Sequence, residues 1–191
     1  MENLQILDRE LFTFLNGAHS PFFDPIMIFL SKIWVWIPLY LAICIWLFAK
    51  RKWQFALLSV VILIIAFAIS DQLSVFIKNI TERLRPCEDP QMVGITRLLE
   101  RHGGLYSFVS SHASNTFSFA FLTAMIIKRP LFSYLIYFWA SAVSYSRIYV
   151  GKHYPGDVIC GIILGLIIGL FLFMLYRFIA SKLKSKYALP Y

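Results

Sequence analysis

Residues 157–180 read DVICGIILGLIIGLFLFMLYRFIA, and this stretch decides the fold. Between Asp157 and Arg177 it carries no charge, and most of its side chains are aliphatic or aromatic. A helix of about 20 such residues is long enough to cross the hydrocarbon part of a bilayer. The stretch therefore predicts a transmembrane helix.

The rest of the chain has a similar composition. Of its 191 residues, 59% are hydrophobic and 15% are charged, and the mean hydropathy is +0.70. Soluble domains average about 45–50% apolar and about 25% charged residues. This composition disfavours a disordered chain, a disulfide scaffold and a nucleic-acid-binding domain, and it leaves little room for a separate soluble domain.

Further apolar segments predict more helices of the same kind. Together with residues 157–180, the expected spans are residues 26–49, 53–77, 113–127 and 131–149. Residues 1–16 carry an apolar stripe opposite charged residues, which predicts an amphipathic helix, either in the membrane interface or docked on the bundle. We expect an all-α fold: one integral-membrane domain over residues 1–191, a polytopic transmembrane helical bundle with about five spans.

The net charge of +8 is unevenly divided between the two ends of this bundle. If the chain alternates sides along five spans, one side receives nine basic residues and no acidic residue: Lys50, Arg51, Lys52, Lys128, Arg129, Arg177, Lys182, Lys184 and Lys186. Short loops rich in Lys and Arg stay in the cytoplasm. We therefore expect a cytoplasmic C-terminus, with the N-terminal helix and the long polar loop on the outer side. The positive charge is interpreted as an orientation signal and not as a nucleic-acid footprint.

Three short polar motifs fall on the outer side. The first is Lys78-x6-Arg85-Pro86, which follows the span over residues 53–77. Lys78 and Arg85 lie two helical turns apart on one face, or about 10 Å along the axis. Taken alone, this pair is most simply a basic collar that snorkels to the interface.

The second motif, Ser110-Ser111-His112, precedes the span over residues 113–127. Serines at that position are good N-caps, and a helix N-terminus also attracts anions. His112 is either a proton donor or a hydrogen-bonded interfacial histidine.

The third motif runs from Ser146-Arg147 to Asp157. Pro155 suits the first turn of a helix, which places His153 just before the span and Asp157 within its first turn. A carboxylate that accepts from one imidazole nitrogen leaves the other nitrogen free as a nucleophile. The alternative is a structural Arg147–Asp157 pair. Ionised groups at a membrane are costly, so functional use is the default.

The ordered set of Lys-x6-Arg-Pro, Ser-x-His and Ser-Arg-x5-His-x3-Asp resembles the type 2 phosphatidic acid phosphatase superfamily. The resemblance covers about residues 78–157, and the flanking spans fit the helical bundle of that family. The middle motif departs from the family's usual Pro-Ser-Gly-His, because Val109 and Ser111 stand in place of the proline and the glycine. Vanadium-dependent haloperoxidases have similar motifs, but those enzymes are soluble. The expected membrane spans therefore argue against that class.

The resemblance implies a mechanism. His153 would attack phosphorus to give a phosphohistidine, Asp157 would orient it, and His112 would protonate the leaving oxygen and then activate water. The phosphate-binding residues would be Lys78, Arg85, Ser110, Ser111 and Arg147. Three cations and a helix N-terminus can balance the phosphoryl charge, so no metal or other cofactor is expected. Glu88 and Asp89 are interpreted as solvated loop residues.

The resemblance also implies a membrane lipid phosphatase in the bacterial inner membrane, with its catalytic pocket at the outer leaflet. Undecaprenyl diphosphate and lipid A phosphate are ranked together above phosphatidate and phosphatidylglycerophosphate as substrates. A non-catalytic lipid-binding or transport protein is a further alternative, which the presence of both histidines disfavours. The expected partners are the bilayer and the lipid phosphate, without nucleic acid or an obligate protein partner.

Three features stay open at this level. Asp71 lies seven residues before Lys78 and either supports it through Ser74 or water, or pairs across helices. Cys87 and Cys160 both fall on the outer side, where a disulfide would join them or both would stay free. The loop over residues 87–107 is either a contact for a lipid headgroup or a mobile solvated segment.

Overall fold

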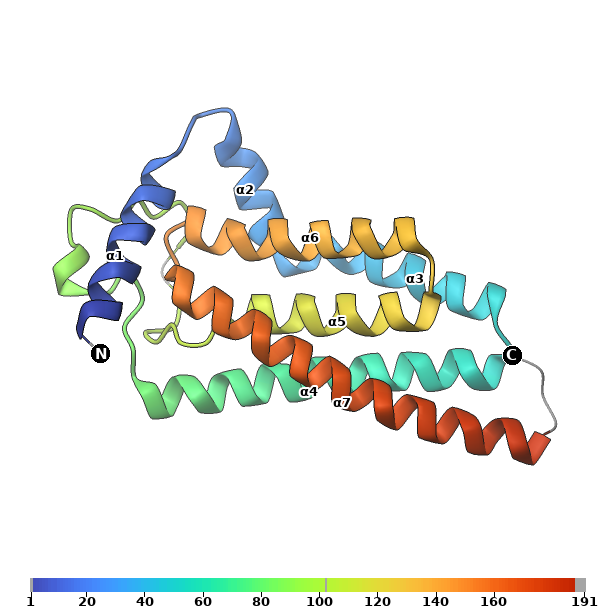
Figure 1. Cartoon of the computed structure of the whole chain (residues 1–191). Helices are drawn as coiled ribbons and strands as arrows, with labels where there is room; N and C mark the ends of the chain where they lie inside the picture. Colours follow the sequence, from blue (N-terminus) through green and yellow to red (C-terminus); the bar gives the residue numbers. More distant parts are fainter. Residues whose placement is uncertain (1, 102, 188–191) are drawn as a thin grey trace.

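The computed structural model describes residues 2–101 and 103–187, which fold into a bundle of long helices (Figure 1). Within these residues the α-helices are α1 (Glu2–Gly17), α2 (Phe23–Ser31), α3 (Ile37–Lys50), α4 (Trp53–Thr81), α5 (Ser111–Ile127), α6 (Pro130–Tyr149) and α7 (Pro155–Tyr187). Two 3-10 helices, η1 (Ile33–Trp36) and η2 (Pro90–Met92), join them, and an isolated bridge pairs Leu84 with Tyr106. No strand occurs in this part of the chain, and the all-α class is confirmed.

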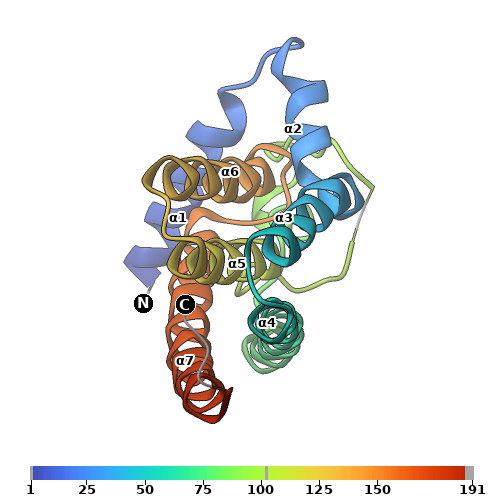
Figure 2. The same cartoon turned by 90° about the vertical axis from the view of Figure 1, so that its right-hand side faces the viewer.

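The central helix of the bundle is α5. In the view along the bundle it lies among α4, α6 and α7, and it packs against all three (Figure 2). Four of its polar side chains are at most 5% exposed: Ser114, Thr116, Ser118 and Thr123. Thr116 and Thr123 donate to helix carbonyl groups of α5 itself, and the Ser118 hydroxyl accepts from Ser70 of α4 at 3.3 Å. Since protein surrounds α5, it can be more polar than a helix that faces lipid.

Glycines allow α7 to pack closely on α5. Gly161, Gly165 and Gly169 recur every fourth residue along α7, a spacing that lets two membrane helices approach closely. A Cβ atom on Gly161 would lie 2.6 Å from the carbonyl oxygen of Ser110, and one on Gly165 would collide with the carbonyl of Ser114. This contact brings the first turns of α5 and α7 side by side, where the Ser110 amide donates to the Asp157 carbonyl at 3.0 Å.

Three helices of the described chain are long and apolar enough to cross a membrane: Ile33–Lys50, Trp53–Thr81 and Pro155–Ser185. They correspond to three of the expected spans. The other two segments are helices as predicted, but α5 has only 17 residues and many buried hydroxyl groups, and α6 also carries several serines and tyrosines. Length and composition alone therefore support three spans, and α5 and α6 run alongside these helices in the same bundle (Figure 1).

The single helix expected over residues 26–49 is wrong. The chain leaves helical geometry at Lys32, which has extended backbone angles, and continues through η1 into α3. Pro38 lies in the first turn of α3, where its missing N–H costs nothing. The indole of Trp36 donates to the carbonyl of Leu30 at 3.1 Å and closes the bend. This break turns Ser31, only 3% exposed, into the interior of the bundle.

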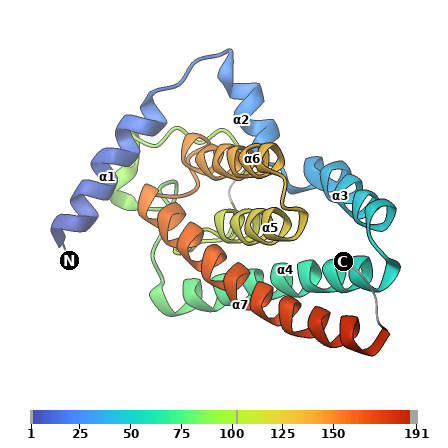
Figure 3. The ribbon, with the colours of Figure 1, turned by 45° about the vertical axis from the view of Figure 1, so that its right-hand side comes forward.

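The predicted amphipathic helix over residues 1–16 is present as α1, and it is docked on the end of the bundle where α7 begins (Figure 3). Its charged side faces the protein: the Asp8 carboxylate accepts from the Gly156 amide at 2.7 Å, and Arg9 pairs with Asp89 at 3.1 Å. The buried ring of Phe12 packs edge-on against Tyr154. The apolar residues Leu4, Leu7, Leu11 and Phe14 are exposed on the opposite side.

Candidate active site

The three predicted motifs meet at one end of the bundle. The end of α4, the start of α5, the end of α6 and the start of α7 all lie at this end, with α1 beside it (Figure 1). This arrangement follows from four consecutive helices that run alternately up and down. The motifs, which are spread over residues 78–157, are thereby brought together into one cluster of charged and imidazole side chains.

His153 and Asp157 form the centre of the cluster. The imidazole Nδ1 lies 3.6 Å from the Asp157 carboxylate, and the side chains are 3% and 0% exposed. This separation exceeds a normal hydrogen bond, and the His153 Nδ1 has no hydrogen-bond partner among the described residues. Catalytic contacts are often long before a substrate binds. The geometry directs Nδ1 to the carboxylate and leaves Nε2 as the nitrogen that can attack.

Asp157 is held by a residue that the sequence interpretation missed. Arg83 Nη1 donates to Asp157 Oδ1 at 2.8 Å, and the Tyr154 amide donates to Oδ2 at 2.8 Å. The other Arg83 nitrogen pairs with Asp8 at 2.6 Å, and the guanidinium lies 4.4 Å from the centre of the Tyr154 ring. The only signal for Arg83 in the sequence is its place between Lys78 and Arg85.

The structural Arg147–Asp157 pair, which was the alternative for the third motif, is not formed. Arg147 instead contacts Glu100 at 3.5 Å and donates to the Ser31 hydroxyl. Glu100 also pairs with Lys152 at 2.8 Å. Burial opposes ionisation of Glu100, but hydrogen bonds from Lys152 and Ser31 and the charge of Arg147 lower its pKa. Neither Glu100 nor Ser31 was predicted, because both come from segments far from the motifs.

The other two predicted cations also lie at this site. Lys78 donates to the Val109 carbonyl and, at 2.7 Å, to the Ser111 hydroxyl, so the first motif is joined to the second. Arg85 is held by its Nε–H, which donates to the Tyr106 carbonyl at 3.1 Å. Its guanidinium lies against Gly103, where an added Cβ would come within 3.1 Å. These contacts show that the two side chains are fixed in the fold and are not a freely snorkelling collar.

The start of α5 has the predicted capping arrangement. Ser110 is the N-cap residue, and its hydroxyl accepts from the Ala113 amide at 3.5 Å. Ser111 is the first helical residue and is not among the described non-glycine residues with positive φ. A serine therefore fits where the family usually has glycine, and its amide is one of the first-turn N–H groups that lack a partner within the helix.

His112 lies on the same side of the cluster as Arg147. Its Nε2 is 3.2 Å from the carbonyl oxygen of Ser31, whose hydroxyl contacts Arg147. His112 and His153 are close enough for their charges to interact. His112 in the first turn of α5 and His153 in the α6–α7 connection are thus brought to one site.

The electrostatics of the site keep His153 neutral. Burial and the positive charges of Arg147, Arg85 and Lys78 hold the pKa of His153 well below its usual range. A neutral imidazole is the form that can act as a nucleophile. The same three charges are the ones that would attract a phosphate group.

The structure shows the surroundings of Asp71 and the state of the three cysteines. Asp71 is partly exposed on α4, and the Ser74 hydroxyl donates to the Ser70 carbonyl at 2.6 Å and not to Asp71. Cys44, Cys87 and Cys160 are free thiols, so the Cys87–Cys160 disulfide is not formed.

The interpretation of Asp89 as a solvated loop residue is wrong. It is 7% exposed and accepts from the Tyr154 hydroxyl at 2.8 Å, in addition to its pair with Arg9. The loop over residues 87–107 is tied to the bundle at further points, since the Asn16 side chain bonds to both backbone groups of Arg97. Within the part of the chain that the structure describes, no group of three or more His, Cys, Asp or Glu residues could hold a metal ion.

A buried histidine beside a carboxylate and three cations, at the end of an apolar helical bundle, is an arrangement suited to binding a phosphate group and attacking it. Comparison with known proteins agrees. The profile of the PAP2 superfamily matches residues 59–180. The chain belongs to the PAP2 superfamily, and it is a membrane lipid phosphatase of that type.

Three similar proteins span most of the chain. A lipid A 4'-phosphatase of Bacteroides thetaiotaomicron is 36% identical over 97% of this chain and 82% of its own length. An undecaprenyl-diphosphatase of Sulfolobus acidocaldarius is 34% identical over 82% of this chain and 72% of its own. The crystal structure of Aquifex aeolicus LpxE superposes with a TM-score of 0.71 at 27% identity, covering 88% of this chain and 95% of that one.

Arg83 should affect the rate more than substrate binding, because it contacts Asp157, Asp8 and the Tyr154 ring, and its expected role is to position Asp157. We expect Arg83→Leu to lower kcat about a hundredfold, the cost of a small misplacement of a catalytic group, with little change in KM. Arg83→Lys should recover part of the rate. The measurement is phosphate release at a series of substrate concentrations, with thermal unfolding recorded for each variant.

The matched control for Arg83 is Arg101→Leu, which removes an exposed arginine from the neighbouring loop. It should leave both constants near those of the unmodified protein. An Arg83→Leu variant with normal kcat, or one whose loss is confined to KM, would contradict the positioning role.

Proposed function

We propose that this chain hydrolyses a phosphate group from a lipid through a covalent intermediate on His153. In the first step His153 Nε2 forms a bond to phosphorus while the bond from phosphorus to the lipid oxygen breaks. His112 donates a proton to that oxygen, and the lipid alcohol or monophosphate leaves. In the second step His112 removes a proton from water, which attacks phosphorus, releases inorganic phosphate and restores the imidazole.

The observation that carries this proposal is a buried His153 that lies beside Asp157 and within the influence of three cations. The Asp157 carboxylate lies 3.6 Å from Nδ1 of the attacking ring and would orient it, and the charges of Lys78, Arg85 and Arg147 act on His153 and would hold the phosphoryl oxygens. The amide of Ser111 and the N-terminus of α5 add to this cradle, with Ser110 as the N-cap. Fixed cations can stabilise the charge that develops on phosphorus oxygens, so we propose that the reaction needs no metal.

Among lipid phosphates, we propose that lipid A phosphate is the substrate, with undecaprenyl diphosphate as the second candidate. The support for lipid A is the relative of that activity that matches nearly the whole chain, and the support for the second is the undecaprenyl-diphosphatase that matches a smaller share. Both are large amphiphiles whose phosphate would enter at the membrane surface. A glycerophospholipid monoester such as phosphatidylglycerophosphate is the remaining alternative. A non-catalytic lipid-binding role has no comparable support, because both histidines are in place.

We also propose how the chain lies in a bacterial inner membrane. The five spans would be α3 with η1, α4, α5, α6 and α7, while α1 and α2 would lie at the outer interface. The exposed apolar side of α1 supports an interfacial position. The side rich in Lys and Arg would be cytoplasmic, with the C-terminus there and the catalytic residues facing the periplasm.

A substrate panel tests the proposed reaction. Purified protein in detergent with EDTA should release inorganic phosphate from a lipid A preparation and from undecaprenyl diphosphate, and the ratio of the two rates identifies the preferred substrate. His153→Asn should lower the rate by at least about 10³-fold, as loss of a nucleophile does, with unchanged helicity and thermal unfolding. His19→Asn, a change at an exposed histidine of the α1–α2 loop, is the matched control.

Two results would contradict this reaction. A His153→Asn variant with normal turnover would exclude His153 as the nucleophile. Absence of phosphate release from lipid A, undecaprenyl diphosphate and phosphatidylglycerophosphate alike would exclude the activity. Brief acid-free quenching with radiolabelled substrate should trap a protein-bound phosphate that is stable to alkali in the native protein and missing from the His153 variant.

The pH dependence follows from the electrostatics of His153. Its pKa is lowered by burial and by three cations, so the imidazole stays neutral and active below its ordinary value of about 6.5. The loss of kcat/KM on the acid side that belongs to His153 should therefore occur below pH 6.5. Arg85→Gln removes one of these cations, makes protonation easier and should move this loss to higher pH. An acid limb that stays in place or moves lower in Arg85→Gln would contradict the arrangement.

Orientation can be measured with engineered cysteines. In a background without the three native cysteines, Val93→Cys lies in the loop beside the catalytic end and Ser185→Cys lies near the end of α7. An impermeant thiol reagent added to intact spheroplasts should label position 93 and not position 185. Labelling of position 185 alone would reverse the proposed orientation.

A further inference from the structure

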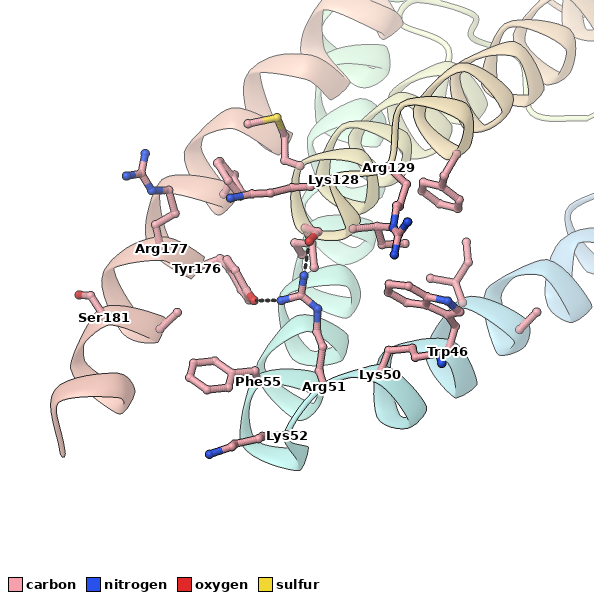
Figure 4. A pocket seen from close by; sticks show the side chains of 18 residues that line it. Trp46, Lys50, Arg51, Lys52, Phe55, Lys128, Arg129, Tyr176, Arg177 and Ser181 are labelled. Atoms are coloured by element: carbon pink, nitrogen blue, oxygen red, sulfur yellow. Dashed lines mark hydrogen bonds between the residues drawn. The ribbon is translucent and has the colours of Figure 1, made fainter. Parts of the chain in front are cut away.

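A cavity lies at the end of the bundle opposite the catalytic residues. Its volume is about 1190 Å³, and it lies between the end of α3, the start of α4, the α5–α6 connection and the last turns of α7 (Figure 4). Ligand pockets for small molecules usually measure about 300–1,000 Å³. The cavity therefore has room for more than a small polar molecule.

Basic side chains surround this cavity. Six of them contribute to its lining: Lys50, Arg51, Lys52, Lys128, Arg129 and Arg177. The lining includes no acidic residue, so their charge is not neutralised within the cavity. They come from three separate connections and helix ends, and the fold gathers them around one space. Such a concentration of positive charge favours an anion.

Arg51 is the most firmly placed of these cations. Its guanidinium donates to the Ile126 carbonyl at the end of α5 and to the Tyr176 hydroxyl of α7 at 3.3 Å. Figure 4 shows it in the middle of the cavity, with Arg129 pointing toward it from above, whereas Lys52 and Arg177 extend outward. A guanidinium has five N–H donors, so Arg51 keeps donors for a ligand after these two contacts.

The position of Arg51 is not explained by membrane orientation alone. Basic residues that only set topology extend their charged ends away from the bundle into water. Lys182, at the same end of the molecule, is exposed and lies against the surface of its own helix, with its ammonium 5.7 Å from the centre of the Phe178 ring. Arg51 instead reaches inward and is bonded to two other helices.

Most of the remaining lining is apolar. It includes Trp46 of α3, Phe55 of α4, Phe132 of α6 and Phe173 of α7. Cationic and aromatic groups in one cavity suit an amphiphile with a charged head and a hydrocarbon tail, whereas a soluble anion would gain nothing from the aromatic side chains. In the proposed orientation this end of the bundle lies at the cytoplasmic leaflet, whose amphiphiles are phospholipids.

We propose that this cavity binds an anionic phospholipid from the leaflet opposite the catalytic site, with its headgroup phosphate on Arg51 and Arg129 and an acyl chain along the aromatic side chains. This site would be separate from the catalytic cluster and would not require the lipid to be a substrate. An anionic headgroup is favoured over a zwitterionic one because the six cations have no acidic partner in the lining.

Native mass spectrometry of the purified full chain tests the proposal. Phosphatidylglycerol and phosphatidylcholine, which share a phosphate but differ in net charge, are added in separate titrations. The unmodified protein should retain phosphatidylglycerol more strongly than phosphatidylcholine. Arg51→Gln with Arg129→Gln should weaken phosphatidylglycerol binding by about fivefold for each lost cation, the typical effect of a basic residue on anionic lipid. Trp46→Leu should weaken both lipids.

Two further variants keep the test decisive. Lys50→Gln with Arg129→Gln leaves the Arg51 contacts intact, so it gives a weakened site even if loss of Arg51 impairs folding. Lys182→Gln with Lys184→Gln removes the same charge from the same end outside the cavity, and it should bind phosphatidylglycerol as the unmodified protein does.

The lipid site would be wrong if the cavity variants and the control bound phosphatidylglycerol equally, or if the unmodified protein did not distinguish the two lipids. Inorganic phosphate added in excess should not displace the lipid. Displacement by millimolar phosphate would assign the cavity to a soluble anion and overturn the lipid proposal.

Discussion

The close approach of α5 and α7 is the constraint on which the site depends. Because Gly161 has no side chain, the start of α7 can lie against the backbone of Ser110, and the Ser110 amide reaches the Asp157 carbonyl. The second and third motifs are joined in this way. Lys78 adds the first motif through its bonds to Val109 and Ser111. A larger residue at the crossing would separate the three motifs by the thickness of a side chain.

The charged side chains at this end of the bundle form connected series of ion pairs and not isolated pairs. Asp157, Arg83 and Asp8 form one such series, and Asp8 also accepts from a backbone amide of α7. Buried charges are costly unless each has partners of this kind. The arrangement explains the unusual orientation of α1, which turns its charged side toward the protein. The apolar side of α1 is then available to lipid, where an amphipathic helix is stable.

The sequence was most informative where the signal was local. The starts of α5, α6 and α7 lie within two residues of expectation, and the cap at Ser110 and the place of His153 before Pro155 also agree, because each depends on neighbouring residues. The prediction failed over residues 26–49, where apolar content concealed a bend at Lys32. It also failed for Asp89, because nothing near Asp89 in the sequence indicates its contacts with Arg9 and Tyr154. The number of membrane spans does not follow from hydropathy, because an apolar side chain packs well against either protein or lipid.

By itself, the sequence determined that the chain is a helical membrane protein and predicted which side chains would carry its phosphatase chemistry. Run length and helical spacing are enough for the first, and the ordered motifs are enough for the second. Only the tertiary structure decided the partners of those side chains: Arg83 for Asp157, and Glu100 with Ser31 for Arg147. It also gathered basic loop residues around a cavity. Such contacts depend on the distance between segments far apart in the chain, and that distance is set by how closely the helices pack.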